Sequence, residues 1–119
     1  MLQKRIKSFG HAFKGMAILF GSQPNARIHA VALSLVVVAG LYFKIDKTEW
    51  LTIVLISALV LSAEAMNTAV EFVVDLISPD YHPLAGKAKD VAAAAVLLAA
   101  FGAVIIGLII FLPKILLLF

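Results

Sequence analysis

The sequence contains no cysteine and very little charge. Of its 119 residues only 14% are charged and 9% are aromatic, with a single tryptophan. Without cysteine, neither disulfide bonds nor thiolate metal ligands are available. A soluble domain carries about 25% charged residues, whereas 63% of the residues here are hydrophobic. These proportions exclude an ordinary soluble domain and predict an integral membrane protein formed by one small domain.

The hydrophobic residues gather in long runs that predict an all-α membrane protein over 1–119. Each run approaches or exceeds the length of about 17–25 residues that crosses a bilayer, and a polar segment at 78–90 precedes the last one. We expect no cleavable signal, because no convincing cleavage site follows the first run. The predicted transmembrane spans are 26–43, 50–77 and 91–112.

Residues 2–20 predict a separate basic amphipathic helix. Apolar side chains recur at every third or fourth position on one face, and basic side chains recur in the same way on another. Such a helix typically lies along a membrane surface with its lysines toward the phospholipid headgroups. Packing on the soluble side of the protein and contact with a phosphorylated substrate stay open as alternatives. The basic positions are Lys4, Lys7, His11 and Lys14.

Lysine and arginine are unevenly divided between the two ends of the spans. Seven of the ten lie up to Arg27 or within 78–90, and three lie on the other side. Because cytoplasmic loops carry the excess of positive charge, we predict that the N-terminus and the second loop are cytoplasmic.

The third span carries small side chains at every fourth position, namely Ala95, Ala99, Ala103 and Gly107. A face of this kind lets helices approach closely. Since three short helices cannot easily enclose several polar side chains, we expect a homo-oligomer whose sites lie in or between bundles.

The second span contains a row of polar side chains: Glu64, Asn67, Glu71 and Asp75. Offsets of 0, 3, 7 and 11 place them on one helical face. Uncompensated charge at membrane depth costs roughly 3 kcal/mol or more per group, which favours a functional role. Glu64 and Glu71 lie two turns, or about 10 Å, apart. They are too distant to chelate one ion together, so we expect different roles, with Asn67 between them as a neutral ligand or hydrogen-bond partner.

Two lysines and an acid precede the third span at Lys87, Lys89 and Asp90. Lysines beside carboxylates suit a nucleotide phosphate with its metal. The Walker pattern is absent, because Tyr81 stands five positions before Gly86. On these grounds alone an enzyme and a proton- or cation-coupled carrier both remain open.

The segments "AEAMNTAVEFVVD" at 63–75 and "SPDYHPLAGKAKDVAAAAVL" at 78–97 together carry a long motif. It reads E-x-x-N-x-x-x-E-x-x-x-D, then Y-H-x-L-x-x-x-A-K-D, and it resembles the signature of the prokaryotic diacylglycerol kinase and undecaprenol kinase family. The resemblance extends over essentially the whole chain. "NARIH" at 25–29 and the closing "GLIIFLPK" are more similar to the undecaprenol kinase branch.

The resemblance implies a homotrimeric membrane kinase whose active sites use groups from neighbouring chains. Such a kinase transfers the γ-phosphoryl group of Mg-ATP to the hydroxyl of undecaprenol or diacylglycerol at the cytoplasmic face of the bacterial plasma membrane. The implied partners are the lipid, ATP and further copies of the chain, without nucleic acid.

The resemblance also implies roles for individual residues. Glu64 would be the general base, Glu71 would bind magnesium, and Asn67 would support that site. Lys89 and Asp90 would contact the ATP phosphates. The residues expected around the nucleotide or the lipid headgroup are Asp80, Tyr81, His82, Lys4 and His11.

Gln23 departs from the family pattern, in which a glutamate acts as a second metal carboxylate. A glutamine offers a carbonyl oxygen without charge, so the second magnesium is in question, and a catalytically impaired lipid-binding member is a further hypothesis. Asp75 matches an acid at the membrane edge, where a structural and a catalytic role are both open.

Overall fold

The computed structural model describes all 119 residues and consists of four α-helices without a β-strand. This architecture confirms the all-α prediction. Three of the helices are long and apolar enough to cross a membrane. The helices are α1 (Leu2–Ser22), α2 (Pro24–Phe43), α3 (Lys47–Ile77) and α4 (Pro83–Leu116).

The polar segment before α4 is shorter than predicted. The prediction of a loop throughout 78–90 was wrong, because α4 already begins at Pro83. Proline fits the first turn of a helix, where its missing N–H would have no partner, and His82 caps this helix start. At its other end, α4 continues through Pro113 rather than stopping before it. Between the predicted helix over 2–20 and the predicted span over 26–43, the single extended residue Gln23 joins α1 directly to α2.

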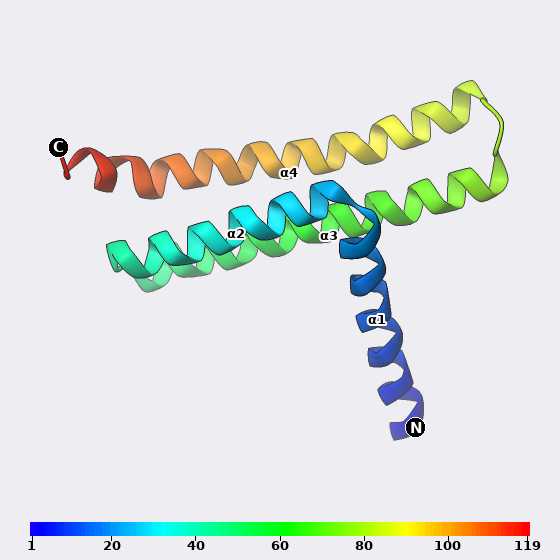
Figure 1. Cartoon of the computed structure of the whole chain (residues 1–119), viewed down its shortest axis with the longest axis horizontal. Coiled ribbons are helices and arrows are strands. Elements are labelled where there is room, and N and C mark those ends of the chain that lie inside the picture. Colours follow the sequence, from blue (N-terminus) through cyan, green and yellow to red (C-terminus); the bar gives the residue numbers. More distant parts are fainter.

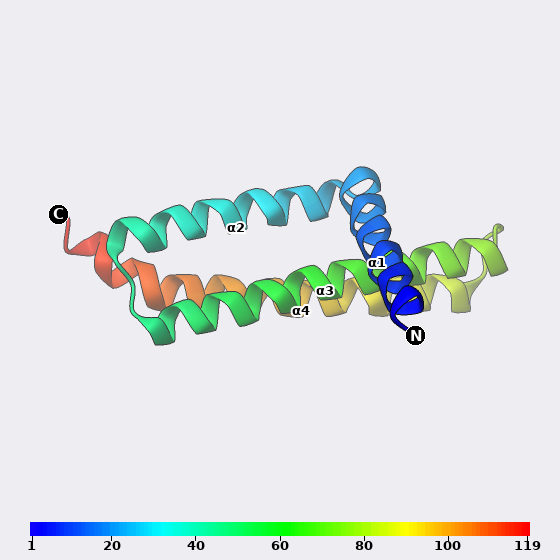
Figure 2. The same ribbon diagram turned by 90° about the horizontal axis from the view of Figure 1, so that it is seen from below.

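The three long helices run alongside one another, and α1 lies crosswise to them (Figures 1 and 2). Figure 1 shows α1 leaving the bundle at the point where α2 begins. Beyond this point α3 and α4 continue side by side to the turn that joins them. The amphipathic α1 therefore marks one boundary of the part of the bundle that contains all three spans.

Helix lengths show which part of the bundle fits a bilayer. With 20 residues, α2 is about 30 Å long, which matches a hydrocarbon core of about 30 Å. The 31 residues of α3 and the 34 residues of α4 correspond to about 46 and 51 Å. Consequently the end of α3 and the start of α4 project past the hydrocarbon on the side where α1 lies.

The apolar core of the single chain lies at the opposite end, between the α2–α3 turn and the last turns of α4. Its buried members are Ile45, Ile53, Ile110 and Phe111. Trp50 packs against this cluster, and its ring contacts Gly40 of α2. A β-carbon at Gly40 would stand only 2.7 Å from Cη2 of Trp50, so the close approach requires glycine.

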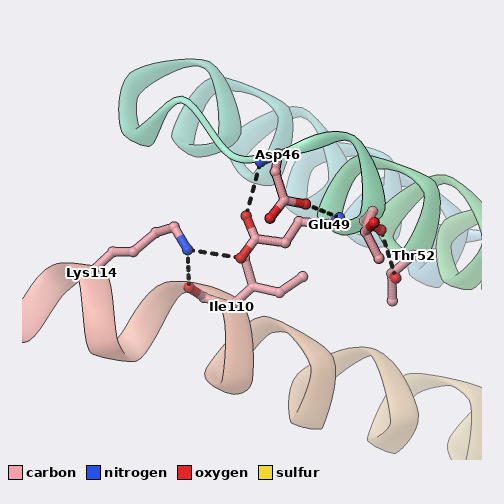
Figure 3. A network of polar contacts seen from close by, with 6 residues as sticks. Asp46, Glu49, Thr52, Ile110 and Lys114 are labelled. Atoms are coloured by element: carbon pink, nitrogen blue, oxygen red, sulfur yellow. Dashed lines mark hydrogen bonds and ion pairs between the residues drawn. The ribbon is translucent and has the colours of Figure 1, made fainter.

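An ion pair links α3 to α4 at the same end, within a small network of polar contacts (Figure 3). Asp46 and Glu49 form a capping box, in which Asp46 Oδ1 accepts the Glu49 N–H at 2.8 Å and Glu49 Oε2 accepts the Asp46 N–H at 3.1 Å. Lys114 Nζ donates to Glu49 Oε1 at 2.9 Å and to the Ile110 carbonyl at 3.2 Å. One ion pair, between Lys114 and Glu49, therefore joins the first turn of α3 to the last turns of α4, and the capping box and the Ile110 carbonyl hold its two partners in place.

Most of the apolar surface of one chain has no protein partner. Only 11 of the 119 residues are buried, and large apolar side chains are exposed on all four helices. Helices that are apolar around most of their circumference belong in lipid or against other helices. The exposed faces of α2, α3 and α4 are therefore suited to lipid or to further copies of the chain.

Substituting Gly40 tests the close contact between α2 and Trp50. We expect Gly40→Ala to lower the free energy of unfolding in detergent by about 1–3 kcal/mol, because an overpacked core must shift a rigid ring. Gly102→Ala is the matched control, since its added β-carbon would lie 3.5 Å from Ile56 Cδ1, an ordinary contact. Equal thermal stability of the two variants would contradict this view of the core.

Candidate active site

Glu64 is the most deeply buried polar side chain of the protein. The residue is only 1% exposed, and it is the largest fully buried one. Thr68, one turn further along α3, is also buried and donates its hydroxyl to the Glu64 carbonyl at 2.9 Å. The carboxylate atom Oε1 accepts no hydrogen bond. Burying such a group without compensation is costly, and costly exceptions of this kind concentrate at functional sites.

His29 of α2 is the one basic side chain within ion-pair distance of Glu64. Its Nε2 lies 3.2 Å from Glu64 Oε1, and its side chain is 25% exposed. The two atoms are within ion-pair distance but do not meet the geometry of a hydrogen bond, and Oε1 therefore keeps its accepting capacity. Sequence reasoning missed this residue. The available signal was a lone imidazole near the start of an otherwise apolar span.

Glu71 lies between two neutral amides. Gln23 Nε2 donates to Glu71 Oε2 and Asn67 Nδ2 donates to Oε1, each at 3.4 Å. The structure thus brings together three of the predicted site residues, one of them 48 positions away in sequence. Asn67 Oδ1 is buried and accepts no hydrogen bond, so this group has an oxygen ready to accept a further partner.

The Glu71 carboxylate and the unpartnered Asn67 Oδ1 are oxygens that suit a hard cation, whereas the amide nitrogens of Gln23 and Asn67 are the atoms that face Glu71. Carboxylate and amide oxygens are the ligands that Mg²⁺ prefers, and Mg²⁺ commonly uses one or two carboxylates together with waters and phosphates. Nowhere in the chain do three or more His, Cys, Asp or Glu side chains form a metal cluster. A cation at Glu71 would therefore depend on amide oxygens and on ligands from outside this chain.

Asp75 and Lys89 connect the end of α3 to the start of α4. Lys89 Nζ donates to Asp75 Oδ1 across the gap between the two helices. Both side chains are substantially exposed, at 40% for Lys89 and 61% for Asp75, so solvent weakens this pair. Asp90 is exposed and forms no ion pair. Since both Lys89 and Asp90 belong to α4, the helix rather than a loop positions them.

Side-chain exposure increases along the acid row from 2% at Glu64 to 61% at Asp75. The two residues are eleven positions apart, which is about 16 Å along a helix. The row therefore runs from a dry interior to the projecting end of α3, with Glu71 half-buried between them.

The turn between α3 and α4 holds three further predicted residues, all exposed: Asp80, Tyr81 and His82. His82 Nδ1 accepts the N–H of Leu84 and so caps α4. The Asp80 carbonyl accepts the Ser78 hydroxyl, whereas Tyr81 is 89% exposed. Within one chain these residues lie beyond Asp75 and do not approach Glu64.

Lys4 and His11 lie on exposed positions of α1 and form no ion pair with the rest of the chain. Near its end, α1 borders an apolar cavity of about 360 Å³ against α3. Ala12, Gly15 and Thr68 are among its lining residues. The cavity thus lies between the surface helix and the stretch of α3 that follows Glu64.

The burial of Glu64 leads to a prediction about stability. We expect Glu64→Leu to raise the free energy of unfolding by about 1–2 kcal/mol, because replacing a buried ionisable group with an apolar one of similar size is often stabilising. Glu49→Leu is the contrasting variant. Its free energy of unfolding should fall by about 1 kcal/mol, because the capping box is broken. Thermal unfolding in detergent measures both. Destabilisation by Glu64→Leu would indicate that the carboxylate supports the fold.

The family described as prokaryotic diacylglycerol kinase matches residues 10–111. An undecaprenol kinase of Bacillus subtilis (strain 168) is 42% identical over 113 residues, which cover 95% of this chain and 92% of that protein.

Two diacylglycerol kinases are also similar. The protein from Synechocystis sp. is 43% identical over 110 residues, covering 92% of this chain and 63% of that protein. The protein from Escherichia coli (strain K12) is 37% identical over 100 residues, covering 84% of this chain and 82% of that protein. With this match along most of its length and three apolar helices suited to a bilayer, the chain belongs to the prokaryotic diacylglycerol kinase family and is a membrane-bound lipid kinase.

Proposed function

We propose that this kinase transfers the γ-phosphoryl group of Mg-ATP to the hydroxyl of undecaprenol. The observation that carries the proposal is the buried Glu64 carboxylate, whose Oε1 accepts no hydrogen bond. Undecaprenol is favoured over diacylglycerol because the relative covered over 92% of its length is named an undecaprenol kinase. Either lipid would deliver a primary hydroxyl from within the membrane, where a buried base can meet it.

Glu64 is the general base in this proposal. A carboxylate base must come within hydrogen-bond reach of the hydroxyl that it deprotonates. The lipid O–H proton passes to Glu64 Oε1 while the lipid oxygen bonds to the γ-phosphorus. The bond from this phosphorus to its bridging oxygen breaks, and ADP leaves with the electron pair. The apolar cavity between α1 and α3 supports an approach of the lipid at this level.

Glu71, Asn67 and Gln23 would hold the magnesium ion. Support comes from the contacts that gather their side chains and from the free Asn67 Oδ1. When bound, the ion would neutralise charge on the ATP phosphates, a major part of catalysis in phosphoryl transfer. The residues proposed to bind ATP are Lys89 and Asp90 at its phosphates, and Asp80, Tyr81, His82, Lys4 and His11 around the nucleotide or the headgroup.

The proposed ATP ligands do not converge within one chain, and this supports a homotrimer with shared active sites. Lys4 and His11 lie on the crosswise α1, away from the turn between α3 and α4 (Figure 1). The apolar faces exposed on α2, α3 and α4 give neighbouring copies a surface to pack on. Ala95 on α4 is exposed and would permit close contact with a helix of a neighbouring copy, whereas Ala99 on the same face is already buried within one chain.

The end of the bundle that bears α1 and the α3–α4 turn is proposed to face the cytoplasm of a bacterium. Seven of the ten lysines and arginines lie in or beside these segments, in accordance with the positive-inside rule. ATP would then reach the exposed end of the acid row directly from the cytoplasm.

Removal of the base tests the proposed function. We expect purified protein with radiolabelled ATP to label undecaprenol faster than diacylglycerol, and Glu64→Gln to lower kcat by about 10²–10⁴-fold. Glu49→Gln is the matched control. It removes one carboxylate charge at the other end of α3, and glutamine still serves a capping box. Full activity of Glu64→Gln would exclude it as the base, and preferential labelling of diacylglycerol would overturn the lipid assignment.

Gln23 offers a test of the metal site. Gln23→Glu would place a second carboxylate beside Glu71, so we expect half-maximal activity at a several-fold lower Mg²⁺ concentration. In EDTA the two carboxylates would repel each other, and the variant should unfold at a lower temperature than the parent. Gln3→Glu, an exposed change on α1, controls for the added charge. An unchanged Mg²⁺ dependence would show that Gln23 is not part of the metal site. It would also exclude the hypothesis that the Gln23 amide limits activity.

A further inference from the structure

The Glu64 carboxylate has a single titratable neighbour, although a base at this depth must present one oxygen in a fixed direction. The residue is 1% exposed, so bulk water cannot orient it. Thr68 serves only the backbone carbonyl of Glu64. The one basic group within ion-pair distance of the carboxylate is Nε2 of His29, at 3.2 Å from Oε1.

Two polar contacts hold the start of α2 in register with α3. Gln23 donates a hydrogen bond to Glu71, and His29 lies within ion-pair distance of Glu64. The helices run in opposite directions (Figure 2). Gln23, directly before α2, is six residues from His29, and Glu64 and Glu71 are seven residues apart on α3. These intervals correspond to about 9 and 10 Å of helical rise. Because the two spacings match, both contacts form side by side between the helices.

Close packing keeps the contact between His29 and Glu64 in place. Ala26 lies three residues before His29, on the same side of α2, and is completely buried. A small residue there lets the first turn of α2 approach its neighbours. Because the backbone is held by Ala26 and by the Gln23–Glu71 contact, the imidazole reaches the carboxylate without a long flexible side chain.

We propose that His29 is a positioning residue that orients the Glu64 carboxylate toward the lipid hydroxyl. The inference rests on the proposed function, in which Glu64 is the base. His29 Nε2 lies within ion-pair distance of Oε1 without meeting the geometry of a hydrogen bond. Oε1 therefore has a lone pair left for the incoming O–H, and the imidazole restrains rotation of the carboxylate. Catalytic hydrogen bonds that are poorly aligned in a free enzyme commonly tighten when substrate binds.

A purely structural pair would behave differently. If His29 only stabilised the buried charge, its loss would lower thermal stability and leave kcat of the folded protein unchanged. If it orients the base, its loss lowers kcat while KM for ATP stays the same, because the nucleotide ligands lie elsewhere. A misplacement of about 1 Å at a reacting group costs on the order of 10²-fold in rate, which sets the size of the effect.

Substitutions that move the N–H donor separate these cases. His29→Gln keeps a donor at about the reach of Nε2, whereas His29→Asn places it about one bond shorter and His29→Leu removes it. We expect kcat for undecaprenol within about threefold of the parent for the glutamine variant, and reduced by about 10–100-fold for the other two. Ser34→Ala controls for a change on the same helix, since its hydroxyl bonds only to its own backbone turn. Comparison of the glutamine and asparagine variants stays informative even if the leucine variant folds poorly.

A double variant shows whether His29 acts through Glu64. On a Glu64→Gln background, His29→Leu should cause no further loss of kcat, since no base remains to be oriented. Infrared spectroscopy gives a readout without turnover. The carboxylate band that disappears in Glu64→Gln should shift in His29→Leu and stay near its position in His29→Gln.

The outcomes distinguish the inference from its premise. If Glu64→Gln is fully active, the assignment of the base fails and the positioning role fails with it. If Glu64→Gln is inactive while His29→Leu and His29→Asn retain kcat, only the positioning role is overturned. Equal losses in the glutamine and asparagine variants, or a full additive loss in the double variant, would also overturn it.

Discussion

A carboxylate in the interior of an apolar bundle has no water to stabilise it, and the polar contacts around Glu64 and Glu71 follow from that constraint. Glu64 is almost completely buried, in a helix whose neighbouring positions suit lipid or other helices. Its single basic neighbour comes from α2. The same helix start also supplies the amide that reaches Glu71. Placing α2 against this face of α3 therefore partners both acids at once, and the crosswise α1 ends where α2 begins (Figure 1).

The mismatch between helix length and bilayer thickness separates the polar groups by depth. Because α3 and α4 exceed the length of α2 by eleven and fourteen residues, their shared end stands in the aqueous zone. Exposure along the acid row changes accordingly, from Glu64 to Asp75. In the proposed reaction the lipid alcohol would arrive from the membrane and the nucleotide from water, and a single helix that crosses this boundary would offer groups to both. The Lys89–Asp75 pair lies in the wet part, where solvent screening keeps it weak enough to exchange partners.

Much of this arrangement could be predicted from periodicity and charge. Apolar runs gave the three spans, and the offsets within 64–75 gave a common face whose members Asn67 and Glu71 are indeed in contact. The start of α4 was mispredicted, because a polar composition over 83–90 resembles a loop when helix-starting Pro83 is not weighed. His29 was missed for a different reason. A lone histidine carries no motif, and only tertiary packing of α2 on α3 brings it to Glu64.

The two ends of the bundle are held by different forces, and this division suits an enzyme that must admit a lipid. All four residues of the apolar core cluster lie at the end remote from α1, where Lys114 and Glu49 also bridge the helices. At the end that carries Glu64 and Glu71, two polar contacts of 3.2 and 3.4 Å link the start of α2 to α3, and the buried apolar residues there, Leu19 and Ala26, lie outside the apolar core cluster. Regions with little buried apolar contact open at lower free energy than a packed core. Anchoring at the remote end would let α2 and α3 separate slightly near Glu64 without loss of register, and the lipid hydroxyl of the proposed reaction would then reach the carboxylate while the bundle remains folded.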